Sequence, residues 1–256
     1  MNEMVCAYAK QLGLPTFARA DDLIRAAREG AWSYEEFLSQ LMAGELTQRR
    51  ENRLQRLTRA AKFPLAKSLD TFDFRRLPHL DASQVWQLAC GEFVKRCENV
   101  IAIGNPGTGK THLAIGLGRR LCREGFKVRF YTAAGLVEEL SEARENRRLS
   151  RLHAQLLKLD VLILDELSYL TFSKAQAELL FHVLSDRNER GSVIITTNLE
   201  FSRWNELFPD TMLTGALVDR LTHHGHILNM NGDSYRLASR LQEEQDKICN
   251  QVSGEE

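Results

Sequence analysis

The chain has 256 residues, of which 43% are hydrophobic and 27% charged, a mix typical of a globular protein with one sizeable core and a small accessory domain. Lys plus Arg and Asp plus Glu both number 34, so the net charge is zero and excludes a whole-molecule attraction to nucleic acid. Five widely spaced cysteines without a CxxC pair suggest neither a disulfide framework nor a zinc site. No apolar run approaches the roughly 20 residues of a membrane span, and the N-terminus lacks a signal-peptide pattern. We therefore expect a cytoplasmic protein without a membrane partner.

The first third of the chain is predicted to be helical. After a short first helix, Ser33 and Glu36 have the spacing of a capping box and mark the start of a second one. Its apolar face, at i, i+3, i+4 and i+7, is formed by Tyr34, Phe37, Leu38 and Leu41. Pro64 then blocks the helix. We therefore assign residues 1–63 to a small all-helical domain that binds DNA or a partner, and residues 64–80 to a linker.

Beyond residue 80, short β-branched runs alternate with segments of helical length. The expected strands are 99–103, 127–131, 161–164, 192–197 and 226–230. Strands separated in this way imply a parallel sheet covered on both faces. The fold class is therefore α/β, with a five-stranded parallel sheet over residues 81–240, followed by a polar tail at 241–256.

The most specific motif is a full GxxxxGK[ST] between the first expected strand and a helix. Its residues are Gly104, Asn105, Pro106, Gly107, Thr108, Gly109, Lys110 and Thr111, and we group the next residue, His112, with them. The glycines allow successive N–H groups to point at phosphate oxygens, and the positive end of the following helix adds to this attraction. We expect Lys110 to reach the β- and γ-phosphates of ATP, and Thr111 to give its hydroxyl to Mg²⁺.

Two other expected strands end in polar residues, at the edge where parallel sheets bind ligands. Asp165 and Glu166 follow the run Val-Leu-Ile-Leu. Asp165 suits the magnesium shell, and Glu166 is placed to take a proton from an attacking water. Asn198 follows two threonines, and its amide can orient water and the γ-phosphate. The alternatives are a helix-capping Asp165 and a turn-forming Asn198.

Arginines supply the remaining candidates. Arg220 precedes the fifth expected strand and Arg236 follows it, and the planar guanidinium suits transition-state phosphate oxygens. Two clusters can bind the phosphates of duplex DNA without reading its sequence. They comprise Arg49, Arg50, Arg53, Arg56 and Arg59, and then Arg144, Arg147, Arg148 and Arg151. The alternative for each cluster is a solvated helix surface.

The ordered set GNPGTGKTHLA, VLILDE, TTN, VDRL and SYR resembles the IstB-like ATPases, the transposition helper proteins of insertion sequences. These are AAA+ P-loop NTPases similar to the DnaC helicase loaders, and the resemblance includes SYEEF and KFPLAKSLDTFDF. It implies that the GKT and DE residues are Walker A and Walker B, and that Asn198 is sensor 1. It implies further that Arg220 is an arginine finger acting on a neighbouring subunit, and that Arg236 is a sensor-2-like residue, although too few residues follow it for a separate helical lid.

The resemblance implies an ATPase that forms a homo-oligomer on DNA, is stimulated by that assembly, and assists a partner transposase. A DnaC-like replicative helicase loader shares the same ATPase core and remains an alternative. A small-molecule P-loop kinase would need a substrate pocket and a lid. A nucleotide-dependent scaffold without turnover is a further alternative, against which Glu166 argues because it directly follows the metal-binding aspartate.

Overall fold

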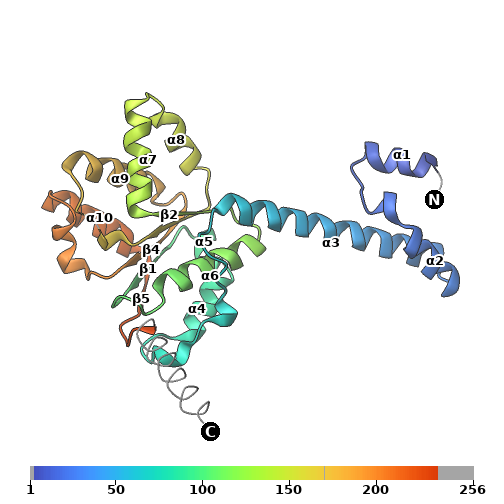
Figure 1. Cartoon of the computed structure of the whole chain (residues 1–256), viewed down its shortest axis with the longest axis horizontal. Coiled ribbons are helices and arrows are strands. Elements are labelled where there is room, and N and C mark those ends of the chain that lie inside the picture. Colours follow the sequence, from blue (N-terminus) through green and yellow to red (C-terminus); the bar gives the residue numbers. More distant parts are fainter. Residues whose placement is uncertain (1–2, 170, 236–256) are drawn as a thin grey trace, which may run out of the picture. The chain divides into compact units, whose positions relative to one another are not determined.

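The computed structural model describes residues 3–169 and 171–235 (Figure 1). The chain divides into two compact units, with the boundary between Arg56 and Leu57. Helix α3 (Tyr34–Ala61) runs through that boundary. Its last turn belongs to the second unit, where Arg129 donates a hydrogen bond to the Ala60 carbonyl. The division therefore falls within the helix, earlier than the predicted limit at residue 63.

The first unit contains α1 (Glu3–Gln11), α2 (Asp21–Glu29) and most of α3. The predicted capping box is confirmed, since the Ser33 hydroxyl accepts the Glu36 N–H at 3.2 Å and the Glu36 carboxylate accepts the Ser33 N–H at 2.7 Å. Inside the unit, Glu45 is only 5% exposed. Hydrogen bonds from Thr16 and Arg49 hold the pKa of that carboxyl below its usual range.

The second unit is built on a five-stranded sheet in which all four strand pairs are parallel, in the order β2-β3-β4-β1-β5. The strands are β1 (Asn99–Ile103), β2 (Val128–Thr132), β3 (Val161–Asp165), β4 (Ser192–Thr197) and β5 (Gly225–Asn229). Every residue of β1, β3 and β4 is buried, as expected of a sheet covered on both faces. The predicted fold class is confirmed.

Helices cover the two faces of the sheet as separate groups (Figure 1). One group comprises α4 (Ala82–Ala89), α5 (Glu92–Lys95) and α6 (Lys110–Arg123). The other comprises α7 (Ala133–Glu145), α8 (Leu149–Leu156), α9 (Lys174–Arg187) and α10 (Thr211–His223). Within the described part of the chain, no helix has both the length and the apolar character that a membrane span requires.

Residues 64–80, predicted as a linker, pack against α6. They form two short 3₁₀ helices, Leu69–Thr71 and Phe74–Arg76. The buried side chain of Leu69 lies where a Cβ on Gly116 of α6 would be, about 2.9 Å from its nearest atom, so the missing side chain of this helical glycine permits the contact. The segment is therefore part of the second unit, because its apolar residues are buried there at spacings that follow neither helix nor strand periodicity.

Candidate active site

The phosphate-binding loop connects β1 to the start of α6. Gly107 and Gly109 have φ of 84° and 94°, backbone conformations that side chains disfavour, and a side chain on Gly107 would also collide with Ser234. Lys110, the first residue of α6, is 8% exposed. Its Nζ donates to the carbonyl oxygens of Gly104 and Asn105, both at 2.7 Å. The ammonium group is therefore held within the loop that would receive phosphates.

A carboxylate and a hydroxyl meet beside this loop. Asp165, the last residue of β3, accepts hydrogen bonds from Thr111 Oγ1 at 3.0 Å to each of its oxygens. It also accepts one from Thr196 Oγ1. Burial raises the pKa of Asp165, against the opposing effect of the two hydroxyls. Adjacent hard oxygen donors fit Mg²⁺, which typically takes one or two carboxylates together with substrate phosphates. Thr111 and Asp165 thus meet the chemical requirement for the metal predicted from the sequence.

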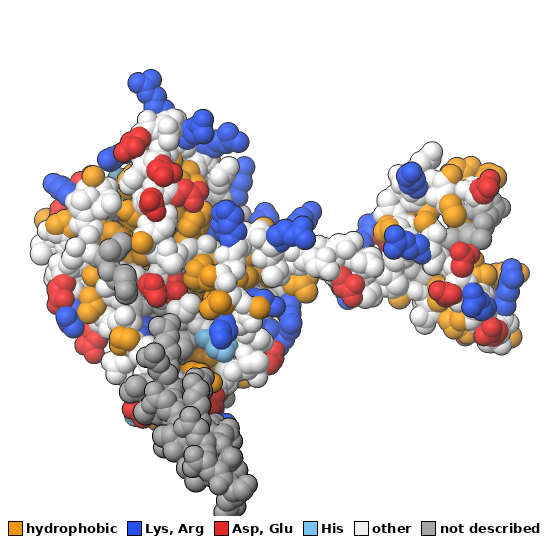
Figure 2. Space-filling view, viewed as in Figure 1, with side chains coloured by type: hydrophobic (Ala, Val, Ile, Leu, Met, Phe, Trp, Pro, Cys, Tyr) orange, Lys and Arg blue, Asp and Glu red, His pale blue; other side chains and the backbone are white. Residues whose placement is uncertain are grey.

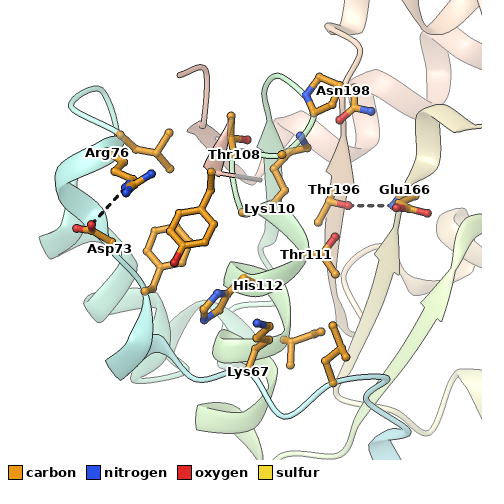
Figure 3. A pocket seen from close by; sticks show the side chains of 18 of the residues that line it. Lys67, Asp73, Arg76, Thr108, Lys110, Thr111, His112, Glu166, Thr196 and Asn198 are labelled. Atoms are coloured by element: carbon orange, nitrogen blue, oxygen red, sulfur yellow. Dashed lines mark hydrogen bonds and ion pairs between the residues drawn. The ribbon is translucent and has the colours of Figure 1, made fainter. Parts of the chain in front are cut away.

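Glu166 has a backbone conformation that is uncommon for a residue with a side chain. Its φ is 58°, in the left-handed region, and its N–H donates to Thr196 Oγ1 at 2.9 Å. The side chain is exposed and lines a pocket of about 760 Å³. The same pocket is lined by Lys110, Thr111 and Asn198 (Figure 3). The structure therefore brings the residues predicted from three separate motifs to one cavity at the carboxyl edge of the sheet.

The opposite wall of the pocket contains residues to which the sequence analysis assigned no role in the site. They are Leu65, Lys67, Thr71, Phe72, Asp73, Arg76, Leu77, Asp233 and Tyr235. The guanidinium of Arg76 lies 4.7 Å from the centre of the Tyr235 ring and 3.6 Å from Asp73 (Figure 3). The Tyr235 N–H donates to the carbonyl of Gly107 at 3.0 Å. The wall therefore presents aromatic rings and charged groups next to the phosphate-binding loop.

His112, grouped with the nucleotide-binding residues in the sequence, anchors that wall. Its Nε2 lies 2.8 Å from the Ser68 carbonyl oxygen and 3.3 Å from Thr71 Oγ1. Its ring meets that of Phe72 edge to face, with centroids 5.3 Å apart. His112 itself lines the pocket, and these contacts join it to residues 68–72 of that wall. Only the composition of the 64–80 segment, rich in aromatic and basic residues, could have hinted at this role.

Of the two arginines predicted to act on phosphate, Arg220 belongs to the described part of the chain and is not among the residues that line the pocket there. Arg220 is exposed on α10, and its guanidinium lies 5.2 Å from the centre of the Phe181 ring on α9. Arg236 lies outside the described residues. The structure thus gives Arg220 no contact with the ATP site of its own chain.

The basic clusters differ in how their members are engaged. In the first unit, Arg49 donates to the Glu45 carboxylate at 2.8 Å and to the Gly13 carbonyl at 3.1 Å. The other four arginines of this cluster, Arg50, Arg53, Arg56 and Arg59, are exposed on α3. The second cluster lies where α7 meets α8, and all four of its arginines are exposed (Figure 2). Arg148 and Arg151 border a hollow that also contains two glutamates, Glu139 and Glu142. The Arg49 guanidinium is thus hydrogen-bonded within the protein. The second cluster has glutamates next to two of its four arginines.

Known proteins with similar sequences share one description. A family model described as IstB-like ATP binding protein matches residues 7–243. The chain is 38% identical to the putative ATP-binding protein of insertion sequence IS5376 from Geobacillus stearothermophilus, over 96% of this chain and 99% of that protein. It is 40% identical to the putative ATP-binding protein of insertion sequence IS21 from Pseudomonas aeruginosa, over 86% of this chain and 83% of that protein.

Solved structures support the fold. The DnaC helicase loader superposes with a TM-score of 0.53 at 24% identity, covering 66% of this chain and 99% of the loader. AMPPCP-bound DnaA from Aquifex aeolicus superposes with a TM-score of 0.56 at 16% identity, covering 66% of this chain and 51% of DnaA. At these identities the likeness shows a shared fold and nothing finer.

Proposed function

Because the chain belongs to the family of IstB-like ATP-binding proteins, we propose that it is a Mg²⁺-dependent ATPase of an insertion sequence, which assembles on DNA and assists a partner transposase. One observation carries the ATPase proposal. Lys110, Thr111, Glu166 and Asn198 line one pocket at the carboxyl edge of the sheet, and the buried carboxylate of Asp165 accepts a hydrogen bond from Thr111. This is the set of groups that hydrolysis of a nucleoside triphosphate needs.

Each residue has a separate task in the proposed reaction. Lys110 exchanges its two carbonyl partners for phosphate oxygens, which are stronger acceptors because they are charged. Thr111 and Asp165 would hold Mg²⁺, which when bound neutralises charge on the phosphates. Glu166 takes a proton from the attacking water, and Asn198 orients that water against the γ-phosphate. The glycines and other residues of the loop hold the phosphates through their backbone N–H groups.

Arg220 is proposed to complete the site of a neighbouring subunit. Its exposure on α10, and its absence from the lining of the pocket in its own chain, support a role outside that chain. An arginine supplied in trans makes hydrolysis dependent on assembly into a homo-oligomer. For Arg236 we retain the sensor role as a proposal drawn from the SYR motif alone.

The DNA and transposase parts of the proposal rest on the relatives and on surface charge. The two relatives described above are named as putative ATP-binding proteins of insertion sequences, which favours a transposase partner; we propose a cytoplasmic location for both. The exposed arginines at the α7–α8 junction and along α3 can contact phosphates of duplex DNA in a largely sequence-independent manner. A helicase loader is the second candidate, favoured by the superposition on DnaC over nearly the whole of that structure.

Nucleotide binding by Lys110→Ala tests the ATPase proposal at its first step. Since Lys110 supplies the charge inside the loop, we expect this variant to lose at least about 100-fold in affinity for ATP, roughly the 3 kcal/mol of a lost charged hydrogen-bond donor. Lys127→Ala is the control, because Lys127 is exposed outside the pocket. Equal ATP affinity of the two variants would refute the assignment of the pocket.

A further inference from the structure

Two hydroxyl groups form hydrogen bonds between the segment after β3 and the end of β4 with the loop that follows it. We propose that Thr196 and Ser168 are positioning residues for hydrolysis, which together hold Glu166 and Asn198 in one fixed arrangement. The inference rests on the proposed ATPase function and identifies the groups that make its site rigid. It concerns two hydroxyl groups that accept backbone N–H groups of Glu166 and Asn198, one of which also contacts the carboxylate of Asp165.

The Thr196 hydroxyl both accepts and donates a hydrogen bond. Thr196 is 1% exposed near the end of β4. Its Oγ1 accepts the N–H of Glu166 at 2.9 Å (Figure 3). It also donates to Oδ1 of Asp165. A β-branched side chain in a strand has few rotamers, so the direction of this hydroxyl is fixed. One group therefore contacts both the carboxylate of Asp165, at the end of β3, and the backbone of Glu166, which follows it.

Glu166 needs such a contact because of its backbone. A left-handed φ of 58° in a residue with a side chain persists only where the surroundings over-determine it. The hydrogen bond from its N–H to Thr196 is the contact that the structure supplies at this peptide. Without it the backbone can relax toward an ordinary conformation, and the carboxylate would move away from the position in which it faces the pocket.

Ser168 makes the reciprocal contact. Its Oγ, on the loop after β3, accepts the N–H of Asn198 at 2.9 Å. On the other side of Asn198, the Leu199 N–H donates to Thr197 Oγ1 at 3.1 Å. The backbone that carries the Asn198 amide is thus held at two successive points.

The two contacts extend the pairing of the strands past its end. The β3–β4 ladder runs from Val161 opposite Ser192 to Leu164 opposite Ile195. Beyond that point, the Thr196 hydroxyl near the end of β4 accepts the N–H of Glu166, and the Ser168 hydroxyl after β3 accepts the N–H of Asn198 after β4. Because both bonds join the same two segments of chain, we infer that they act as one unit, and that loss of either allows the segments to separate.

Steady-state kinetics of three variants test this inference. Thr196→Val removes the hydroxyl at similar shape, Ser168→Ala removes the reciprocal one, and Thr196→Ser restores a hydroxyl. We expect the first two to lower kcat by about 10- to 100-fold, because misplacing catalytic groups by an ångström has effects of this size. KM and ATP affinity should change by less than about threefold, since ground-state binding is retained. Thr196→Ser should recover most of kcat.

Ser192→Ala is the matched control, because Ser192 is a fully buried hydroxyl at the other end of β4, 3.5 Å from the Phe93 carbonyl. It should leave kcat unchanged. In the double variant Thr196→Val, Ser168→Ala, the loss should be smaller than the product of the two single losses. A wild-type kcat for folded Thr196→Val and Ser168→Ala would overturn the inference, as would independent losses that multiply. The proposed ATPase function would survive that result if Glu166→Gln still blocks hydrolysis.

Discussion

The two ends of the β3–β4 pair are built from different chemistry. At the carboxyl end, short hydroxyl and carboxylate side chains contact one another and leave oxygens and an amide facing a pocket. At the amino end, one long side chain donates its hydrogen bonds to backbone carbonyls. Arg187 is 1% exposed, and its guanidinium donates to the carbonyls of Leu156, Leu159, Asp160 and Ser192.

Arg187 serves the stability of the fold, whereas the polar side chains at the carboxyl end are available for a reaction. Burial lowers the pKa of Arg187 to about 10, so the side chain stays charged at neutral pH. Its hydrogen bonds go to carbonyls at the end of α8 and at the starts of β3 and β4, and two of these carbonyls, those of Leu156 and Asp160, also accept a backbone N–H. At the carboxyl end, the side chains of Glu166 and Asn198 are exposed to the pocket instead. Substitutions at the two ends should therefore change different quantities.

The largest expected effect lies in the rate of hydrolysis. If the carboxyl end is a working site completed by a neighbour, Arg220→Ala should bind ATP through its own loop but hydrolyse it roughly 10³- to 10⁵-fold more slowly, the range for arginine fingers. Mixing it with Lys110→Ala subunits, which retain Arg220, should restore phosphate release. The in-trans role is wrong if the two proteins co-assemble and the mixture stays inactive.

At the amino end the expected effect is on stability. Arg187→Met removes the side-chain donor of four carbonyls, two of which keep a backbone N–H partner, and we expect the free energy of unfolding to fall by about 3 kcal/mol, because buried acceptors lose hydrogen bonds from a charged group. Urea unfolding of Arg187→Met and of the exposed neighbour Arg190→Met measures the difference. The comparison of the two ends fails if Arg187→Met keeps its stability, or if it lowers kcat per folded molecule as strongly as Glu166→Gln.

A smaller effect is expected on DNA binding. Arg144 and Arg147 are exposed and are absent from the acidic hollow that Arg148 and Arg151 border. Changing both to Gln should lower the log–log slope of duplex affinity against salt by about 0.9 for each lost phosphate contact. The matched control is Arg49→Gln, because Arg49 is engaged by Glu45 and Gly13. A greater change for Arg49→Gln would assign the main contact to α3.

The strands and the phosphate-binding loop were predictable from the sequence because their signals are local. Five short apolar runs bounded by turns gave the strands within one or two residues, and Lys110 and Asp165 lie on patterns that can be read along the chain. The pairing of those patterns in one pocket followed from a general property of parallel sheets, whose carboxyl ends share one edge.

Other features depend on contacts between distant segments. Arg187 has the sequence context of a surface arginine near a helix end, and only the assembled backbone shows four carbonyls around it. The packing of residues 64–80 against the second unit could not be predicted from the sequence. The buried residues Leu69 and Leu77 are not spaced as they would be on one face of an α-helix or a strand. The roles of Thr196 and Ser168 depend on the β3–β4 register, which the sequence alone does not specify.

Measuring phosphate release by Glu166→Gln tests most directly whether the protein hydrolyses ATP with Glu166 as the general base. The substitution keeps the size of the side chain and removes its basicity, so we expect ATP affinity like that of the wild type and turnover at least about 100-fold slower, as for the loss of a general base. Glu124→Gln, an exposed glutamate outside the pocket, is the control and should hydrolyse normally. Hydrolysis by Glu166→Gln at the wild-type rate, with ATP bound equally well, would contradict the account.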